Sequence, residues 1–374
     1  MIVNDSNWEN KKVLVTGASG FKGSWLCATL NALGAKVFGT TRDQIHPDSA
    51  FTAMRLETYI TKVTGDITNR QQVYDMINSV EPDVIFHLAA KALVPVSLRD
   101  PRRTFDVNIM GTLNIIEACR KLEVCDKILI CSTDHVFGYI EPKDLPAGGF
   151  PENARVSYGG PYDTSKAAME LLVRSYHATY WSEVPAIGIT RCANVFGYGD
   201  VNQRRIIPLF VSKAVNGDPI PLKYRKNGRQ FIHITDAIAG YIRAASTLDE
   251  PVNKNEVGGE KPNRSPFTPT FHFAIESYEG TEEPYIRMQA LSSFVCKLFS
   301  VDVDDSVAVD YAKNENKVQA LNCSKTRSDI NWSIRKPFND AIIDLSKWYR
   351  QGEDINSHQA EINKDVEYIL DGLD

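Results

Sequence analysis

Two short segments of the sequence gather side chains that could move protons. The first is "STDHVFG", in which a hydroxyl, a carboxylate and an imidazole stand at Thr133, Asp134 and His135. The second is "YDTSK", which places Tyr162 and Lys166 four residues apart. Polar residues are common where a strand leaves a sheet, and a tyrosine–lysine pair occurs by chance in many helices. The elements around the two segments therefore have to distinguish an acid–base cluster from an ordinary polar turn.

The spacing of Tyr162 and Lys166 predicts that both side chains share one face of a helix, because residues four apart are neighbours on an α-helix. That helix is expected over "SKAAMELLVRSYHATY". A phenol titrates near pH ~10, and a nearby ammonium together with a positively charged nicotinamide would lower this pKa. The pair could then accept a hydroxyl proton while a hydride leaves for a nicotinamide cofactor.

Apolar strands alternate with helices along the part of the chain before residue 200. The expected strands are "KVLVTG", "AKVFGTT", "PDVIFHLAA", "DKILICST" and the start of "AIGITRCANVFG", and helices are expected over 24–34 and 104–122. Continuously apolar strands between helices are typical of a parallel sheet covered on both faces. The sequence therefore predicts an α/β fold of the Rossmann type, with a doubly wound parallel sheet and "STDHVFG" at the end of one strand.

A glycine motif follows the first strand directly. In "GASGFKG" the glycines stand at 17, 20 and 23, between a strand and a helix. Glycines allow a tight turn and a close approach of backbone N–H groups to a pyrophosphate, and the helix N-terminus favours the negative charge. With the strand, the helix and a following acidic residue in place, the motif predicts a dinucleotide-binding site.

Two residues after the second strand point to different cofactors. Asp43 lies 20 residues beyond Gly23 and could accept hydrogen bonds from the adenosine ribose of NAD. Its neighbour Arg42 could instead pair with the 2′-phosphate of NADP. We expect NAD and leave NADP open. Asp66, in "GDI", could bind the adenine amine, although a turn at the end of a strand explains it almost as well.

Composition excludes several other classes of function. The chain has 374 residues, of which 43 % are hydrophobic and 24 % are charged, and its net charge is −5. No basic field is present that would favour nucleic acid or an anionic membrane surface. The seven cysteines form no Cys-x-x-Cys pair, which favours reduced thiols in the cytoplasm over disulfides or a zinc site. We expect no metal site, no leader peptide and no membrane span.

The C-terminal part of the chain differs in character. The range 250–285 is rich in Asn, Gly, Pro and charge and predicts a long loop, whereas "RMQALSSFVCKLF" and "PFNDAIIDLSKWYRQG" predict helices. We expect residues 1–190, with part of 229–248, to form the cofactor-binding domain. Residues 191–228 and 249–374 are expected to form a smaller substrate-binding lobe interleaved with it.

Taken together, these motifs resemble the extended short-chain dehydrogenase/reductases that act on nucleotide sugars. The resemblance covers nearly the whole chain and rests on the three glycines, Asp66, "HLAA" (87–90), Asn108, Thr133, Tyr162 and Lys166. The stretches "TGASGFKGSWLC", "RCANVFGYGDVNQRRIIP", "LNCSKTRSDINW" and "WYRQGEDINSHQAEIN" are most similar to the CDP-glucose 4,6-dehydratase branch. The resemblance implies a tightly held NAD, oxidation of the sugar at C4, loss of water across C5 and C6, and return of the hydride to C6.

The resemblance also implies roles for the residues of "STDHVFG". Thr133 would bind the 4-hydroxyl beside Tyr162, and a protonated Asp134 would supply the acid for the departing C6 hydroxyl. Relatives carry Glu or Lys where this chain has His135, whose imidazole could remove the C5 proton near neutral pH. This departure leaves open a nucleotide-sugar epimerase or 4-keto reductase of the same superfamily, or a cofactor-binding protein with altered catalysis.

The remaining assignments also follow from the family. The residues implied for cofactor binding are Gly17, Gly20, Phe21, Gly23, Arg42, Asp43, Asp66, Ile67, Leu88, Ala89, Ala90, Asn108, Tyr162 and Lys166. The residues implied for substrate binding are Lys91, Asn194, Arg204, Arg205 and Arg229, with Asn194 and Arg229 on the diphosphate. Lys91 could equally face solvent, and adjacent arginines on a loop, such as Arg204 and Arg205, are more often solvated. His87 ends a buried strand and is predicted to be a hydrogen-bonded core residue. Family members dimerise through the helices near 105–121 and 164–180, so a homodimer or homotetramer is expected.

Overall fold

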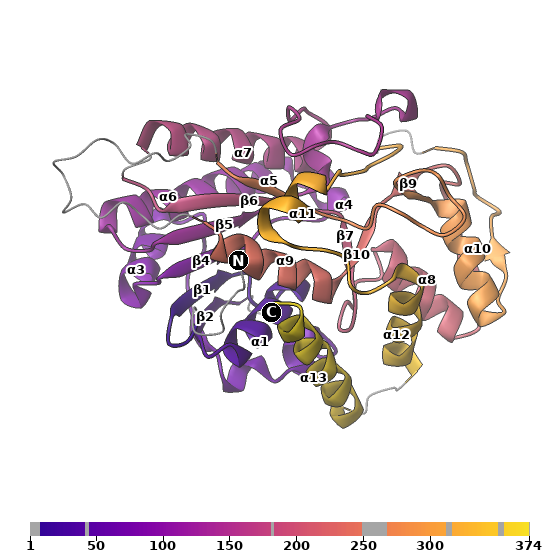
Figure 1. The fold of residues 1–374 in the computed structure, drawn as a ribbon, viewed down its shortest axis with the longest axis horizontal. Helices are drawn as coiled ribbons and strands as arrows, with labels where there is room; N and C mark the ends of the chain where they lie inside the picture. The colour runs from indigo at the N-terminus through magenta and orange to yellow at the C-terminus, as the bar shows by residue number, and fades with distance from the viewer. Residues whose placement is uncertain are drawn as a thin grey trace.

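The fold centres on one seven-stranded parallel sheet (Figure 1). The computed structural model describes residues 8–41, 45–180, 183–248, 268–311, 316–350 and 355–373. The strand order is β11-β6-β5-β4-β1-β2-β3, and every neighbouring pair is parallel. The strands are β1 (Lys12–Thr16), β2 (Lys36–Thr40), β3 (Thr61–Val63), β4 (Val84–His87), β5 (Lys127–Cys131), β6 (Ala186–Cys192) and β11 (Thr270–Phe273). The order reverses between β1 and β4, and ligands bind at such a switch point in doubly wound sheets.

The strands are buried because helices cover both faces of the sheet. All residues of β6 are buried, as are the last four residues of β1 and of β5. Continuously apolar strands of this kind are typical of parallel sheets that do not face solvent. The prediction of a Rossmann-type, doubly wound parallel sheet is therefore confirmed.

Each face of the sheet has its own set of helices and its own core. On one face, α3 (Arg70–Val80), α6 (Gly111–Leu122) and α7 (Pro161–Tyr180) pack around a cluster that includes Ile85 and Ile128. On the other face, α1 (Phe21–Ala32), α9 (Ile234–Ser246) and α13 (Ile355–Asp371) pack together over a larger cluster that includes Trp25. Because both faces are occupied, the polar groups that remain accessible lie at the ends of the strands.

The single helix expected over 104–122 is divided into three parts. Helix α5 (Pro101–Phe105) leads into a π-helical turn, η3 (Asp106–Met110), which continues as α6. Asn108 lies in this turn and bonds both the backbone N–H and the carbonyl of Lys91. π-helical turns are rare and occur mostly at functional sites, and this one carries a residue that the sequence assigns to cofactor binding.

Two segments after residue 249 pack against the central sheet or the helices that cover it. The predicted loop over 250–285 is wrong at β11, which pairs with β6 at the edge of the sheet. This strand is only four residues long, and it is specified by buried side chains such as Phe271 and Phe273 rather than by its flanking sequence. Helix α13 packs against α1 and α9. Residues 249–267 are outside the described residues, and the division of the remaining chain into two parts stays a prediction.

Small sheets and further helices complete the described structure, and β7, β9, β10, α8, α10 and α12 lie to the right of the central sheet in Figure 1. The two-stranded sheets are β7 (Asn194–Phe196) with β10 (Phe231–His233), β9 (Gly228–Arg229) with β12 (Ile286–Arg287), and β8 (Ile220–Pro221) with β13 (Val303–Asp304). The other helices there are α8 (Ile206–Val215), α10 (Met288–Phe299) and α12 (Phe338–Arg350). The remaining helical segments are α2 (Ala50–Ala53), η2 (Leu56–Thr58), α4 (Val94–Arg99), η4 (Asp134–Phe137), η5 (Pro142–Asp144) and α11 (Ser324–Ile330). Across the described ranges, no helix combines the length and apolar character needed to cross a membrane.

Candidate active site

A cavity of about 490 Å³ opens at the carboxyl end of β5, where the two proton-transfer segments meet. Its walls include the turn after β5, the start of α7, the β7–α8 connection and β9, together with parts of 92–98, 206–210 and 221–224. The sequence-predicted residues that line it are Thr133, Asp134, His135, Tyr162, Asn194, Arg204, Arg205 and Arg229. The structure thus brings together the residues assigned to catalysis and those assigned to substrate binding, apart from Lys91 and Lys166.

The segment "STDHVFG" forms a helical turn and also presents a buried carboxyl group. Thr133 caps η4 by accepting the N–H of His135 at 3.3 Å, and its hydroxyl donates to Asp134 Oδ1 at 3.0 Å. Asp134 is only 5 % exposed, and within the described structure no hydrogen-bond partner is found for Oδ2. Burial raises the pKa of Asp134, which favours the protonated form that an acid requires.

Tyr162 and Lys166 lie on the first turns of α7, as the spacing predicts. The Tyr162 phenol is hydrogen-bonded to Thr133, which lowers its pKa, but burial has the larger effect and raises the pKa above its ordinary value. The expectation of a lowered tyrosine pKa is therefore not met by the protein's own groups. Lys166 Nζ donates to the carbonyl of Cys131 at 2.6 Å, and burial lowers its pKa to about 8.

His135 is held by a carboxylate from α7. Its Nδ1 lies 2.8 Å from Oδ1 of Asp163, and its ring meets the ring of Tyr162 edge to face at 5.5 Å. Burial lowers the pKa of His135, but the hydrogen bond to Asp163 and the charges of Asp134 and Asp163 outweigh it, so the pKa is raised overall. The imidazole therefore has a fixed partner on one ring nitrogen.

A buried ion pair supports the turn from behind. Ser132 donates to Glu170 Oε1 at 2.7 Å, and Arg191 binds both oxygens of the same carboxylate at 2.9 and 2.6 Å. Arg191 also lies over the ring of Phe137, the last residue of η4, at 5.0 Å. Because Glu170 lies on α7 and Arg191 on β6, this pair fixes the turn relative to both elements.

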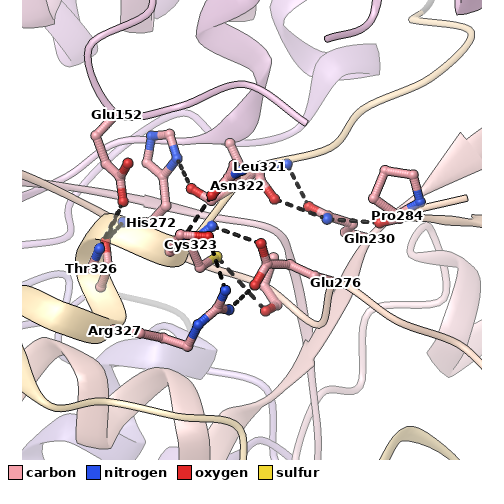
Figure 2. A network of polar contacts seen from close by, with 12 residues as sticks. Glu152, Gln230, His272, Glu276, Pro284, Leu321, Asn322, Cys323, Thr326 and Arg327 are labelled. Carbon is pink, nitrogen blue, oxygen red and sulfur yellow. Dashed lines mark hydrogen bonds and ion pairs between the residues drawn. The ribbon is translucent and has the colours of Figure 1, made fainter. Parts of the chain in front are cut away.

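Arg191 also joins this ion pair to a group of polar contacts that includes His272, Asn322, Glu152 and Thr326, and Figure 2 shows that group. Arg191 Nη1 donates to Nε2 of His272 at 3.2 Å, and Nδ1 of that histidine donates to the carbonyl of Asn322 at 3.1 Å. Thr326 bonds Glu152 through its N–H and its hydroxyl, at 3.0 and 2.7 Å. The connection before α11 is therefore anchored to the sheet edge by buried hydrogen bonds.

The glycine motif forms a cradle between β1 and α1. Gly17 has φ of +76°, a conformation that favours glycine, and a side chain there would also approach the backbone of Ala89 at 3.0 Å. A side chain at Gly23 would overlap the carbonyl oxygen of Gly17. The Gly17 N–H donates to the hydroxyl of Thr40, at the end of β2, at 2.9 Å. Two of the three predicted glycines are thus required by their surroundings.

The other residues assigned to the cofactor lie around this cradle. Asp66 accepts hydrogen bonds from Thr68 and pairs with Arg103 at 2.7 Å. Ile67 is buried against Gly111, and Phe21, Leu88, Ala89 and Ala90 are partly exposed beside the glycine turn. Arg42 and Asp43 lie outside the described residues, so the choice between NAD and NADP rests on the sequence alone.

Two polar residues assigned from the sequence support the backbone near the site. His87 bonds Thr16 at 2.8 Å and Thr112 at 3.0 Å, and burial lowers its pKa to about 3, so the prediction of a hydrogen-bonded core histidine is confirmed. Asn108 donates to Ser165 Oγ at 2.8 Å as well as bonding the backbone of Lys91. The Lys91 side chain is exposed and does not line the cavity.

Three arginines also line the cavity. Arg229 is buried and bonds the carbonyl of Gly228 at 2.9 Å, and its charge lowers the pKa values of Asp134 and His135. Arg205 pairs with Asp200 at 2.9 Å and covers the Phe21 ring, whereas Arg204 is exposed. Asn194 is exposed and donates to the carbonyl of Gln230 at 3.1 Å. Guanidinium groups in the lining suit a phosphate-bearing ligand.

Comparison with known proteins places this geometry in a family. The model of the NAD dependent epimerase/dehydratase family matches residues 13–257. The chain belongs to this family. It is 25 % identical over 363 residues to CDP-glucose 4,6-dehydratase from Salmonella typhimurium, covering 95 % of each chain. It is 28 % identical over 351 residues to dTDP-glucose 4,6-dehydratase from Streptomyces antibioticus, covering 90 % of this chain and 92 % of the relative.

Solved structures of epimerases share the fold of this family member. UDP-glucose 4-epimerase of Thermus thermophilus in complex with NAD superposes with a TM-score of 0.73 at 20 % identity, covering 91 % of this chain and 99 % of the epimerase. Dehydratases and epimerases are thus both among the similar proteins. The protein is an enzyme of the superfamily of nucleotide-sugar dehydratases and epimerases, and its particular reaction has to be argued from its site.

Within the family, two residues near the cavity were missed by the sequence analysis. Asp163 stands inside the quoted "YDTSK" segment, but only the folded structure brings it to His135. Lys22 stands inside the glycine motif, lines the cavity, and donates to Cys131 Sγ and to the Tyr241 hydroxyl, each at 3.1 Å. Lys22 could have been recognised from the sequence alone, because a basic residue within a glycine motif is unusual enough to suggest a functional role. Among the described residues, no group of His, Cys, Asp or Glu is arranged to hold a metal ion.

Proposed function

We propose that this protein is an NAD-dependent nucleotide-sugar 4,6-dehydratase. The observation that carries the proposal is the placement of Asp134 and His135 beside Tyr162 in one cavity. Oxidation at C4 needs one proton acceptor, which Tyr162 with Thr133 can supply. Loss of water needs in addition an acid for the C6 oxygen and a base for the C5 proton. A buried carboxyl group with a raised pKa and a neighbouring imidazole meet both requirements.

The glycine cradle fits a dinucleotide, because a side chain at 23 would collide with the backbone of the tight turn between β1 and α1, and one at 17 would approach the backbone of Ala89. Such a turn is what brings backbone N–H groups to a pyrophosphate. Gly17, Gly20 and Gly23 would hold the pyrophosphate, Asp66 the adenine, and Lys166 the nicotinamide ribose. NAD, when bound, would take the hydride from C4, return it to C6, and add a positive charge that lowers the pKa of Tyr162.

The chain's own residues would act in sequence on the sugar. Tyr162 accepts the proton of the 4-hydroxyl, and Thr133 donates a hydrogen bond to the same oxygen. Once C4 is a ketone, the C5 proton becomes acidic and His135 removes it. Asp134 protonates the departing C6 hydroxyl, so that water leaves.

CDP-glucose is the first substrate to test, because a CDP-glucose 4,6-dehydratase matches 95 % of the chain. Asn194, Arg204, Arg205 and Arg229 would bind the diphosphate. Relatives of the CDP-glucose type carry Trp beside this arginine or one residue further on, whereas here the next residue is Gln230. Its side chain is buried and bonds the backbone of Leu321 on both sides, with Oε1 accepting the N–H at 2.6 Å and Nε2 donating to the carbonyl at 3.1 Å. Other nucleoside bases therefore belong in the same experiment.

A 4-epimerase or a 4-keto reductase is the alternative, and it is favoured by the similarity to an epimerase and by a Tyr162, Thr133 and Lys166 set that suffices for redox chemistry at C4.

We also propose a homodimer formed through α6 and α7, a proposal that the 45 % exposed Met110 and the 58 % exposed Leu171 support. Seven unpaired cysteines support a cytoplasmic location.

The test is to incubate the purified protein with CDP-glucose and, in parallel, with dTDP-, UDP- and GDP-sugars, without added cofactor. A dehydratase is expected to release a product lighter by one water molecule, with the alkali-stable absorbance of a 4-keto-6-deoxy sugar and no net change in bound NAD. Conversion to an isomer of equal mass would establish an epimerase. A requirement for NADPH, with its consumption, would establish a reductase.

A further inference from the structure

The pairing of His135 with Asp163 is not explained by either of the two motifs that contain these residues. His135 follows β5, whereas Asp163 lies in the first turn of α7, between Tyr162 and Lys166. The ring nitrogen Nδ1 and the carboxylate oxygen Oδ1 are 2.8 Å apart. The side chains are 20 % and 6 % exposed, respectively, so the pair is shielded from solvent on the side of Asp163.

Contacts other than the one with His135 hold the Asp163 carboxylate in place. Its second oxygen, Oδ2, accepts the N–H of Gly160 at 3.2 Å. A side chain at Gly159 would overlap this carboxylate, so the chain packs closely around it. The carboxylate also lies in the first helical turn, where the helix dipole stabilises negative charge. These contacts hold the acceptor rigidly, which a positioning residue requires.

The contact determines which nitrogen of His135 can act as a base. A carboxylate only accepts hydrogen bonds, so the proton lies on Nδ1 and the lone pair lies on Nε2. Across the described residues, Nε2 has no hydrogen-bond partner, and the ring lines the cavity. The edge-to-face contact with Tyr162 at 5.5 Å limits rotation of the ring.

We propose that Asp163 is the positioning residue that makes His135 the acceptor of the C5 proton, so that an aspartate–histidine dyad stands where relatives use a single Glu or Lys. The inference rests on the proposed dehydratase function and adds Asp163 to it. In the step, the C5–H bond breaks and its proton moves to Nε2 of His135. The electron pair forms the C5–C6 double bond, the C6–O bond breaks, and Asp134 protonates the departing oxygen. After hydride returns to C6, the imidazolium gives its proton back to C5.

The charges that face His135 agree with this role. Asp163 from α7 and Asp134 from η4 raise its pKa, whereas burial and Arg229 from β9 lower it, and the result is a raised pKa. A base is most effective when its pKa is near the operating pH, and an imidazole begins just below neutrality. Removal of the Asp163 charge is therefore expected to shift the titration of His135 to lower pH.

The experiment compares the full-length wild-type protein with Asp163→Asn, His135→Gln and Asp48→Asn. Asparagine keeps the shape of the side chain and can still accept the Gly160 N–H, but it can also donate to Nδ1 and so stabilise the other tautomer. Asp48 is the matched control, because it faces His46 in an exposed pair at 3.8 Å. Nitrogen-15 NMR of the histidine rings, with His135 assigned by its loss in His135→Gln, reports the tautomer and the titration without any substrate.

The expected result has three parts. The wild-type spectrum shows His135 protonated on Nδ1 in its neutral form, and Asp163→Asn shifts its titration to lower pH. Dehydration by Asp163→Asn falls by ~10²-fold, the size expected when a general base is impaired. Reduced nicotinamide accumulates on adding the sugar, because C4 oxidation continues while C5 deprotonation does not. Asp48→Asn changes none of the three.

The proposal is overturned if wild-type His135 carries its proton on Nε2, a measurement that needs no Asp163 variant to fold. It is also overturned if Asp163→Asn loses activity while the tautomer and titration of His135 stay as in the wild type, because Asp163 would then be only structural. Failure of the proposed function looks different. In that case the wild type dehydrates none of the sugars, and the role of His135 as acceptor of the C5 proton is refuted together with the proposed function. The NMR result still decides whether Asp163 orients His135.

Discussion

Replacing Arg191 by methionine should destabilise the protein strongly, because Glu170 would lose its buried partner. Glu170 is 0 % exposed and Arg191 is 1 % exposed, and two hydrogen bonds of 2.6 and 2.9 Å join them. Methionine fills similar space without a charge, so the change isolates the loss of the guanidinium. The further contacts of Arg191 with the Glu152 carbonyl and with His272, both at 3.2 Å, are lost as well.

The magnitude follows from what remains around Glu170. Removing one partner of a buried ion pair costs about 3–5 kcal/mol, since the other charge stays buried and unpaired. Arg174 remains 3.6 Å from Glu170, but its side chain is 33 % exposed and replaces only part of the lost interaction. We therefore expect a loss of about 3 kcal/mol in the free energy of unfolding.

Urea titration followed by circular dichroism measures this loss, with the exposed pair of Arg225 and Asp305 as the control. Arg225→Met should change the free energy of unfolding by less than about 0.5 kcal/mol, because these side chains are 34 % and 57 % exposed. Adding Glu170→Gln to Arg191→Met should restore part of the stability, since no buried charge is then left. A loss below about 1 kcal/mol for Arg191→Met, or no recovery in the double variant, would refute the reasoning.

Three further outcomes are expected. Gly23→Ala should abolish retention of the cofactor through purification, because the new methyl group would overlap the carbonyl of Gly17; measured cofactor content equal to wild type would contradict this. Burial lowers the pKa of Lys166 to about 8 in the folded protein. Between pH 8 and about 10 the unfolded chain therefore binds one more proton than the folded protein. The free energy of unfolding should rise with pH across that window by an amount on the order of 3 kcal/mol. Urea titrations of Lys166→Met should lack this rise, and an unchanged rise would show that other groups cause it. Gln230→Ala should lower the free energy of unfolding by about 2 kcal/mol or more, because it leaves the N–H and carbonyl of Leu321 without their partner; a stability equal to wild type would contradict the network in Figure 2.

The features that the sequence predicts well are those that depend on short stretches of chain. The glycine motif, the strand that ends in "STDHVFG", and the face shared by Tyr162 and Lys166 each lie within one strand–turn or one helix. Local spacing is enough to place these residues, and the alternation of apolar strand and helix predicts a parallel sheet without fixing the order of its strands. His87 could likewise be recognised as a core residue from its place at the end of a buried strand.

The features that escaped prediction depend on contacts between distant segments. Asp163 reaches His135 only because α7 begins beside the turn after β5, and no periodicity encodes that approach. The Tyr162 pKa was expected to fall beside Lys166 and a bound nicotinamide; among the protein's own groups, the Lys166 ammonium donates to a backbone carbonyl and burial raises the Tyr162 pKa. Gln230 could not be recognised as a structural residue, because its partner Leu321 lies in a different part of the chain.

The late position of β11 in the chain has a consequence for folding. Strand β6 is paired with β5 on one side, and on the other side only with β11, where Thr270 meets Ile189 across a long connection. A nascent chain that has been synthesised only as far as α9 therefore presents β6 as an open edge, with unpaired backbone groups and buried-type side chains. Pairing across such a sequence separation slows folding and exposes partly formed sheets to aggregation. The sheet is therefore completed, and the segment before α11 anchored, only late in the synthesis and folding of each chain.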